Sequence, residues 1–255
     1  MTAKRLAGQR VVVTRAAHQA ERLLRELRDR GAEAVPLPLI ELTPPPDPHA
    51  LERAVELLPE IDWLVFTSAN AVAALMPRVS GPLETPCAVV GAATARALKG
   101  YGVEASLVAS VPRATGLLEA LLPRLELGAH VLVPQAADAR PELVNGLTAA
   151  GVAVTAVTAY GKRQPPAAES QARELFTGST IGWVSFTSPR IARNFASLFG
   201  DDWPHRRDEI KALSIGPVTS SALHALGVEA VIEAPRPSDT GLVDALLQAI
   251  ADPRR

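Results

Sequence analysis

The residues best suited to chemistry lie in short polar turns, each between an apolar β-branched run and a stretch with helical periodicity. Serine, threonine and asparagine at such positions cap the free backbone N–H groups of a helix N-terminus, which is the simpler interpretation of any single turn. Several turns together favour a binding site, because helix N-termini attract carboxylates and phosphates. The candidate binding residues are Thr67, Ser68, Asn70, Gly91, Thr94, Thr187, Ser188, Gly216 and Thr219.

Tyr160 is the candidate proton donor. It is one of two tyrosines, and it lies in a proline-containing stretch with Lys162 and Arg163 directly after it. A phenol, with an unperturbed pKa of about 10, can act as a weak general acid. A linker tyrosine that only packs between two lobes fits the same pattern equally well.

The sequence lacks the motifs of several enzyme classes. It contains no glycine-rich dinucleotide or P-loop motif and no G-x-S-x-G nucleophile motif. The five histidines show no metal-ligand spacing, and the single cysteine excludes both an intrachain disulfide and a cysteine zinc site. We therefore expect neither a metal nor a cofactor.

The composition and charge of the chain argue against some kinds of binding partner and location. Lys and Arg number 26 against 27 Asp and Glu, so the net charge of −1 argues against nucleic acid as the main partner. The longest charge-free stretch, residues 143–161, includes Asn145, three glycines and several threonines, so no membrane span is expected. Lys4 and Arg5 precede only a short apolar run, so we expect no secretory signal and a cytoplasmic location.

The segments that carry the turns occur twice along the chain. The first two pairs below are offset by 120 positions and the last two by 125, all in the same order. The matching segments are RVVVTR (10–15) with HVLVPQ (130–135), DWLVFTSAN (62–70) with GWVSFTSPR (182–190), VVGAATARAL (89–98) with SIGPVTSSAL (214–223), and TGLLEALL (115–122) with TGLVDALL (240–247). This order indicates an internal duplication.

Each copy alternates short strands with helices, which predicts parallel βαβ units and doubly wound α/β sheets. The length suits two such domains of flavodoxin-like size. Their turns would lie at the carboxyl ends of the strands, where open α/β sheets bind ligands. Two proline-rich stretches, residues 36–46 and 157–166, occupy equivalent places in the repeat and are either paired linkers or ordinary loops.

The motifs FTSANAV, VVGAATARAL, FTSPRIARNF, SIGPVTSSAL and DTGLVDALL resemble those of uroporphyrinogen-III synthases, over about residues 10–250. The resemblance implies two doubly wound parallel-sheet domains with an exchange of segments. Residues 1–36 would join residues 165–255 in one discontinuous domain, and residues 44–156 would form the other. Residues 37–43 and 157–164 would be the two linker strands.

The resemblance also implies an activity. The substrate would be hydroxymethylbilane, a linear polycarboxylate tetrapyrrole, which the enzyme closes with loss of water and inversion of ring D to give uroporphyrinogen III. This hydro-lyase reaction belongs to haem biosynthesis and uses no metal or cofactor. By match to the family pattern, Tyr160 would assist loss of the hydroxyl, Arg15 would bind a carboxylate, and the turn residues named above would line the substrate site.

Other interpretations remain open at this point. A noncatalytic two-lobed protein that binds a carboxylate or phosphate ligand would have a similar fold. A synthase domain that has lost turnover and serves regulation would keep the same pattern. We expect a monomer, and a transient contact with the upstream hydroxymethylbilane synthase is an open expectation.

Overall fold

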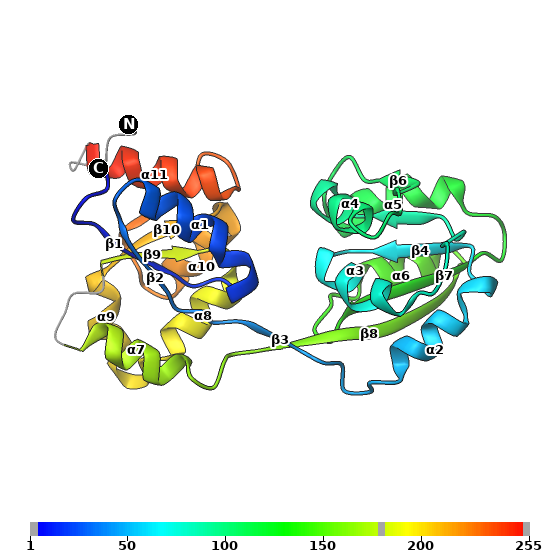
Figure 1. The fold of residues 1–255 in the computed structure, drawn as a ribbon, viewed down its shortest axis with the longest axis horizontal. Coiled ribbons are helices and arrows are strands. Elements are labelled where there is room, and N and C mark those ends of the chain that lie inside the picture. Colours follow the sequence, from blue (N-terminus) through cyan, green and yellow to red (C-terminus); the bar gives the residue numbers. More distant parts are fainter. Residues whose placement is uncertain (1–4, 178–181, 252–255) are drawn as a thin grey trace. The chain divides into compact units, whose positions relative to one another are not determined.

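The computed structural model describes residues 5–177 and 182–251, and the ends of the expected first domain, residues 1 and 255, lie outside them. The chain forms two compact units. Unit 1 comprises Met1–Glu41 with Arg163–Arg255, and unit 2 comprises Leu42–Lys162. In each unit a sheet lies between helices on its two faces, as Figure 1 shows.

Unit 1 contains a five-stranded sheet in the order β11-β10-β9-β1-β2, with every neighbouring pair parallel. Its strands are β1 (Arg10–Val13), β2 (Glu33–Pro36), β9 (Gly182–Phe186), β10 (Ile210–Ser214) and β11 (Val231–Glu233). Its helices are α1 (Ala17–Asp29), α7 (Ala168–Phe176), α8 (Pro189–Ser197), α9 (Trp203–Arg206), α10 (Pro217–Ala225) and α11 (Asp239–Ala251), with 3-10 turns at Gly200–Asp202 and Arg207–Glu209.

The alternation of side chains along the strands gives this sheet two apolar faces. Val11 and Val13 of β1 belong to the core that includes residues of α1 and α11. Val12 points to the opposite core, which includes Phe195 of α8. Leu37, which falls in an expected linker, is fully buried in that second core.

Unit 2 contains a six-stranded sheet in the order β3-β8-β7-β4-β5-β6. Its strands are β3 (Glu41–Thr43), β4 (Trp63–Phe66), β5 (Cys87–Val89), β6 (Leu107–Val108), β7 (His130–Ala136) and β8 (Ala153–Arg163). Its helices are α2 (Ala50–Glu56), α3 (Ala69–Leu75), α4 (Ala92–Lys99), α5 (Ala114–Leu121) and α6 (Glu142–Ala149), with 3-10 turns at Leu58–Glu60, Met76–Arg78 and Leu122–Arg124. Burial of Cys87 in this sheet raises the pKa of its thiol to about 12.

The two sheets repeat one strand order. Offsets of 120 and 125 residues carry β6-β5-β4-β7-β8 onto β11-β10-β9-β1-β2. Each unit therefore combines strands from both copies: β1 and β2 of the first copy pair in one sheet with β9, β10 and β11 of the second. This architecture confirms the expected fold class of two doubly wound parallel-sheet units.

The described helices of this chain are short or carry polar residues. None of those in 5–177 and 182–251 is both long and apolar enough to cross a bilayer.

Candidate functional site

The residues expected to bind a ligand gather at the carboxyl edge of the sheet within each unit. Parallel strands end at the same edge, so the turns that follow them are neighbours. In unit 1 this edge carries Arg15, Thr187, Ser188, Gly216 and Thr219, after β1, β9 and β10. In unit 2 it carries Thr67, Ser68, Asn70, Gly91 and Thr94, after β4 and β5.

Ser68 and Ser188 are equivalent helix caps. Each has an extended backbone, and its hydroxyl accepts the N–H of the residue three positions on, at 3.1 Å from Ala71 and 3.3 Å from Ile191. The capping interpretation of these two turns is therefore confirmed.

Gly91 and Gly216 cap α4 and α10 with almost the same backbone conformation, φ 170° with ψ 178° and φ 166° with ψ 177°. Their carbonyl groups accept the N–H groups of Thr94 at 3.1 Å and Thr219 at 3.0 Å. Thr94 and Thr219 are each only 3% exposed, so most of each residue is packed within the turn. A Cβ at Gly91 would lie 3.2 Å from the Cβ of Pro112, whereas one at Gly216 would meet nothing within 4 Å.

Tyr160 lies near the end of β8, in the stretch 157–164 for which the resemblance implied a linker strand. Its ring is 6% exposed and packs in the core of unit 2. The phenol oxygen is 3.1 Å from the hydroxyl oxygen of Ser68, so either group can donate. Lys162 lies over the ring, its Nζ 5.5 Å from the centroid, and also contacts Asp138 at 3.2 Å. The structure thus brings Tyr160 to the turn after β4.

Arg15 is held by an acid that the sequence analysis did not single out. Its guanidinium forms an ion pair with Asp239, the first residue of α11, and the two side chains are 20% and 14% exposed. Arg22 of α1 approaches the same carboxylate at 3.9 Å. The Nε of Arg15 is buried and has no hydrogen-bond partner among the described residues. A ligand carboxylate would therefore have to compete with Asp239 for Arg15.

A second polar group at this edge was also missed. Ser220 of α10 donates to the carboxylate of Glu233 at 2.6 Å and lies 2.9 Å from the hydroxyl oxygen of Ser214. Ser214, the last residue of β10, donates to the Gly216 carbonyl at 3.0 Å. The only sequence signal was the presence of serines at both ends of the SIGPVTS turn, because Glu233 resembles any exposed residue at a strand end.

Ser68 both caps α3 and contacts Tyr160, whereas Ser188 only caps α8. We therefore expect replacement by alanine to lower the free energy of unfolding more at Ser68 than at Ser188. Ser188→Ala should lower the free energy of unfolding by about 1 kcal/mol, the usual loss of a helix cap. Ser68→Ala should cost about 2 kcal/mol, because it also removes the partner of the Tyr160 phenol. Urea denaturation of each variant measures this. Equal losses, or no coupling in a double-mutant cycle with Tyr160→Phe, would contradict the paired role.

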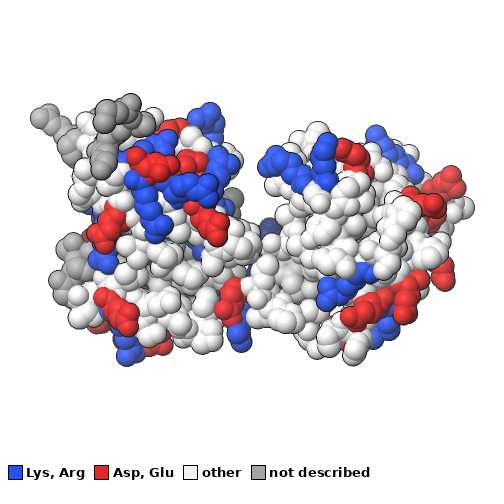
Figure 2. Space-filling view, viewed as in Figure 1, with Lys and Arg blue, Asp and Glu red and all other residues white. Residues whose placement is uncertain are grey.

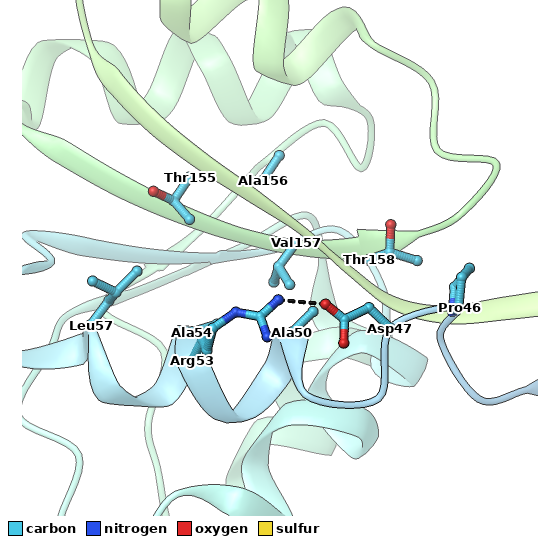
Figure 3. Close-up of a pocket in the computed structure, with 10 residues that line it drawn as sticks. All are labelled: Pro46, Asp47, Ala50, Arg53, Ala54, Leu57, Thr155, Ala156, Val157 and Thr158. Carbon is cyan, nitrogen blue, oxygen red and sulfur yellow. Dashed lines mark hydrogen bonds and ion pairs between the residues drawn. The ribbon is translucent and has the colours of Figure 1, made fainter.

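A cavity of about 370 Å³ in unit 2 lies apart from these turns, between α2 and β8. Figure 3 shows its lining, in which Arg53 and Asp47 form an ion pair beside Ala50 and Val157. None of the expected site residues lines it.

Among the described residues, neither a concentration of charge nor a group of metal ligands marks the site. Figure 2 shows acidic and basic side chains interspersed on the visible face of each unit. Within the part of the chain that the structure describes, no group of three or more His, Cys, Asp or Glu could hold a metal ion.

Comparison with known proteins gives a consistent result. The model of the family described as Uroporphyrinogen-III synthase HemD matches residues 4–244. A uroporphyrinogen-III synthase of Synechococcus elongatus is 32% identical, over 97% of this chain and 98% of the relative. A chloroplastic uroporphyrinogen-III synthase of Oryza sativa is 29% identical, over 94% of this chain and 80% of the relative.

Solved structures share the fold. A mutant uroporphyrinogen III synthase of Thermus thermophilus superposes with a TM-score of 0.65 at 21% identity, covering 96% of this chain and 99% of that one. A uroporphyrinogen-III synthetase of Helicobacter pylori gives 0.64 at 19% identity, covering 94% and 99%. With the family match over nearly the whole length, the chain belongs to the uroporphyrinogen-III synthase family.

Proposed function

We propose that this chain performs the reaction of its family in tetrapyrrole biosynthesis. It closes hydroxymethylbilane to uroporphyrinogen III, with loss of water and inversion of ring D, as a hydro-lyase. The observation that carries the proposal to particular residues is the contact of 3.1 Å between Tyr160 and Ser68 at the carboxyl edge of unit 2. It joins the one candidate proton donor to a turn of the expected binding set.

The turns supply groups suited to the substrate. Ala92 and Ala93 begin α4, and the N–H groups of a helix's first residues have no intrahelical partner. Such N–H groups bind carboxylates without a formal positive charge. We propose that the edge residues of both units contact the substrate, with Arg15 as a contact that Asp239 restrains.

Holding the flexible bilane is the main task, because the ring must close through the intended carbon atom. Fixing two reacting groups in a productive geometry can lower a barrier by several kcal/mol, and by about 7–11 kcal/mol in the best intramolecular cases. Backbone N–H groups are well suited to this role, since they are already fixed by the helix and strand that carry them.

Tyr160 would act on the leaving group. Its phenol proton moves to the departing hydroxide, which leaves as water, while the electron pair of the adjacent pyrrole nitrogen replaces the broken C–O bond. Ser68 would orient the phenol, and a proton released from the pyrrole at ring closure balances the one donated. These steps break one C–O bond and form one C–C bond with no net oxidation or reduction, so the proposal includes no metal or cofactor.

Substitution of Thr94 and Thr219 tests whether the turns at the carboxyl edges bind the tetrapyrrole. Thr94→Ala or Thr219→Ala should weaken binding of uroporphyrinogen III about three- to tenfold, the worth of one hydrogen bond. An anaerobic fluorescence titration measures this affinity. Thr94→Ser and Thr219→Ser are the controls, because they retain the hydroxyl and should bind as the unmodified chain does. Unchanged affinity in both alanine variants would remove these threonines from the site.

An isomer assay tests the function itself. Freshly generated hydroxymethylbilane is incubated with the protein and oxidised, and uroporphyrins I and III are separated by chromatography. Predominant isomer III, absent without protein, supports the synthase. Isomer I alone, from folded protein, would overturn it. Tight product binding without turnover would then favour a noncatalytic binding protein or a regulatory domain.

Location and assembly belong to the same proposal. We propose that the protein is a cytoplasmic monomer that receives hydroxymethylbilane through transient contact with the upstream synthase. The relative from Oryza sativa is named as a chloroplastic protein. We also propose that residues 1–36 with 165–255, and residues 44–156, act as the two domains of the enzyme, with 37–43 and 157–164 as linker strands.

A further inference from the structure

The duplicated turns before α4 and α10 share one backbone conformation but differ in chemistry. The offset of 125 residues relates Ser214, Ser220 and Glu233 of unit 1 to Val89, Ala95 and Val108 of unit 2. Unit 2 keeps the conformation of Gly91 without any of these polar groups. The group formed by Ser214, Ser220 and Glu233 is therefore not needed to shape the turn, and its role lies in the polar atoms that it presents.

The turn before α10 is a poor site for an anion. Pro217, at the first position of α10, has no N–H group, whereas its counterpart Ala92 has one. The N–H of Gly216 points to the hydroxyl oxygen of Ser214, at 3.4 Å. Glu233 adds a negative charge, which would repel a substrate carboxylate brought close to it.

Glu233 also differs from the other acids at the carboxyl edges. Asp239 pairs with Arg15, and Asp138 pairs with Lys162. Within residues 5–177 and 182–251, Glu233 forms no ion pair and is anchored only by the neutral Ser220. It ends β11 and is exposed, so its carboxylate retains capacity to accept further hydrogen bonds.

We propose that Glu233 is a specificity-determining residue that accepts hydrogen bonds from pyrrole N–H groups of the tetrapyrrole and keeps the substrate's carboxylates away from the α10 turn. This inference rests on the proposed function. A bilane carries N–H donors as well as carboxylates, so its site needs acceptors as well as donors. The α10 turn also exposes Pro217 and Val218, the latter 69% exposed, which suits contact with a pyrrole ring. The α10 turn thus suits the N–H face of a pyrrole ring, whereas the α4 turn suits a carboxylate.

Two variants at this position test the inference. Glu233→Val, which copies Val108, should raise KM for hydroxymethylbilane and Kd for uroporphyrinogen III about tenfold, the usual loss of a charged hydrogen bond. Glu233→Gln, which can still accept from Ser220, should raise both about threefold. In each variant kcat should change less than KM, and the melting temperature should stay near that of the unmodified chain.

Glu229→Gln is the matched control. Glu229 is exposed and lies before the opposite end of β11, so the same charge is removed from the same strand region far from the edge. It should leave KM and Kd unchanged.

The outcomes separate the two hypotheses. If the unmodified chain makes isomer III and Glu233→Val keeps its KM and Kd, the role of Glu233 is wrong and the synthase proposal stands. If the unmodified chain binds uroporphyrinogen III without turnover, a tenfold loss of affinity in Glu233→Val still supports the contact while the catalytic proposal fails. A chain that neither turns over nor binds the tetrapyrrole overturns both.

Discussion

Tyr160→Phe should lower kcat for isomer III formation by about a hundredfold, with less than a threefold change in KM, because a positioned general acid contributes about 10²-fold or more. The phenolic hydroxyl is the only group lost. Its oxygen lies 3.1 Å from that of Ser68, and the ring is already fixed in the core of unit 2. Stopped incubations with fresh hydroxymethylbilane, followed by separation of the isomers, give both parameters.

The fold should tolerate this change well. Phenylalanine fills the same volume, so the expected loss of unfolding free energy is about 1 kcal/mol, the net worth of one hydrogen bond. Tyr101→Phe is the matched control, since Tyr101 is 44% exposed and lies after α4, away from the turns at the carboxyl edge. It should keep the full rate. If Tyr160→Phe also forms isomer III at the full rate, the phenol only stabilises the turn at Ser68 and takes no part in catalysis.

The sequence predicted the architecture well because the duplication is a local signal repeated in order. Matches such as residues 62–70 with 182–190 placed equivalent strands and turns, and the two sheets share one strand order. The cap roles of Ser68 and Ser188 were predictable for the same reason, since a cap depends on residues three positions away. The exchange of the first βα unit between copies came only from the resemblance, because periodicity does not say which strands pair.

The parts that sequence reasoning missed depend on distant partners. Arg15 and Asp239 are 224 positions apart, so nothing in the local pattern showed that the arginine has an internal acid. The bond between Ser220 and Glu233 likewise crosses from a helix to the next strand. The resemblance implied a linker strand at residues 157–164 but not the packing of Tyr160 in the core of unit 2, where Val157 and Ala159 of β8 are buried beside it.

Gly241→Ala should lower the free energy of unfolding of unit 1 by about 3 kcal/mol, because the new methyl group overlaps backbone rather than a movable side chain. Gly241 is in the first turn of α11, and its Cβ would collide with the carbonyl oxygen of Arg236 and lie 3.1 Å from that carbonyl carbon. That carbonyl already accepts the N–H of Ser238 at 2.8 Å, so the loop cannot simply turn it away.

The same requirement occurs in the other copy. A Cβ at Gly116 of α5 would overlap the carbonyl oxygen of Val111 and lie 2.7 Å from its Cβ. Both copies of the T-G-L motif therefore use glycine to let the preceding loop lie against the helix. Gly116→Ala should destabilise unit 2 by a similar amount.

Tryptophan fluorescence during urea unfolding separates the two effects. Trp183 and Trp203 report on unit 1, and Trp63 reports on unit 2. Gly216→Ala is the control for stability, because its Cβ would meet nothing within 4 Å and its φ of 166° suits any residue. If Gly241→Ala is as stable as this control, the loop before α11 can move to accept the methyl group.

Loss of activity in a still-folded Gly241→Ala protein is also expected, since a shift of Ser238 moves Asp239 and with it the ion pair that holds Arg15.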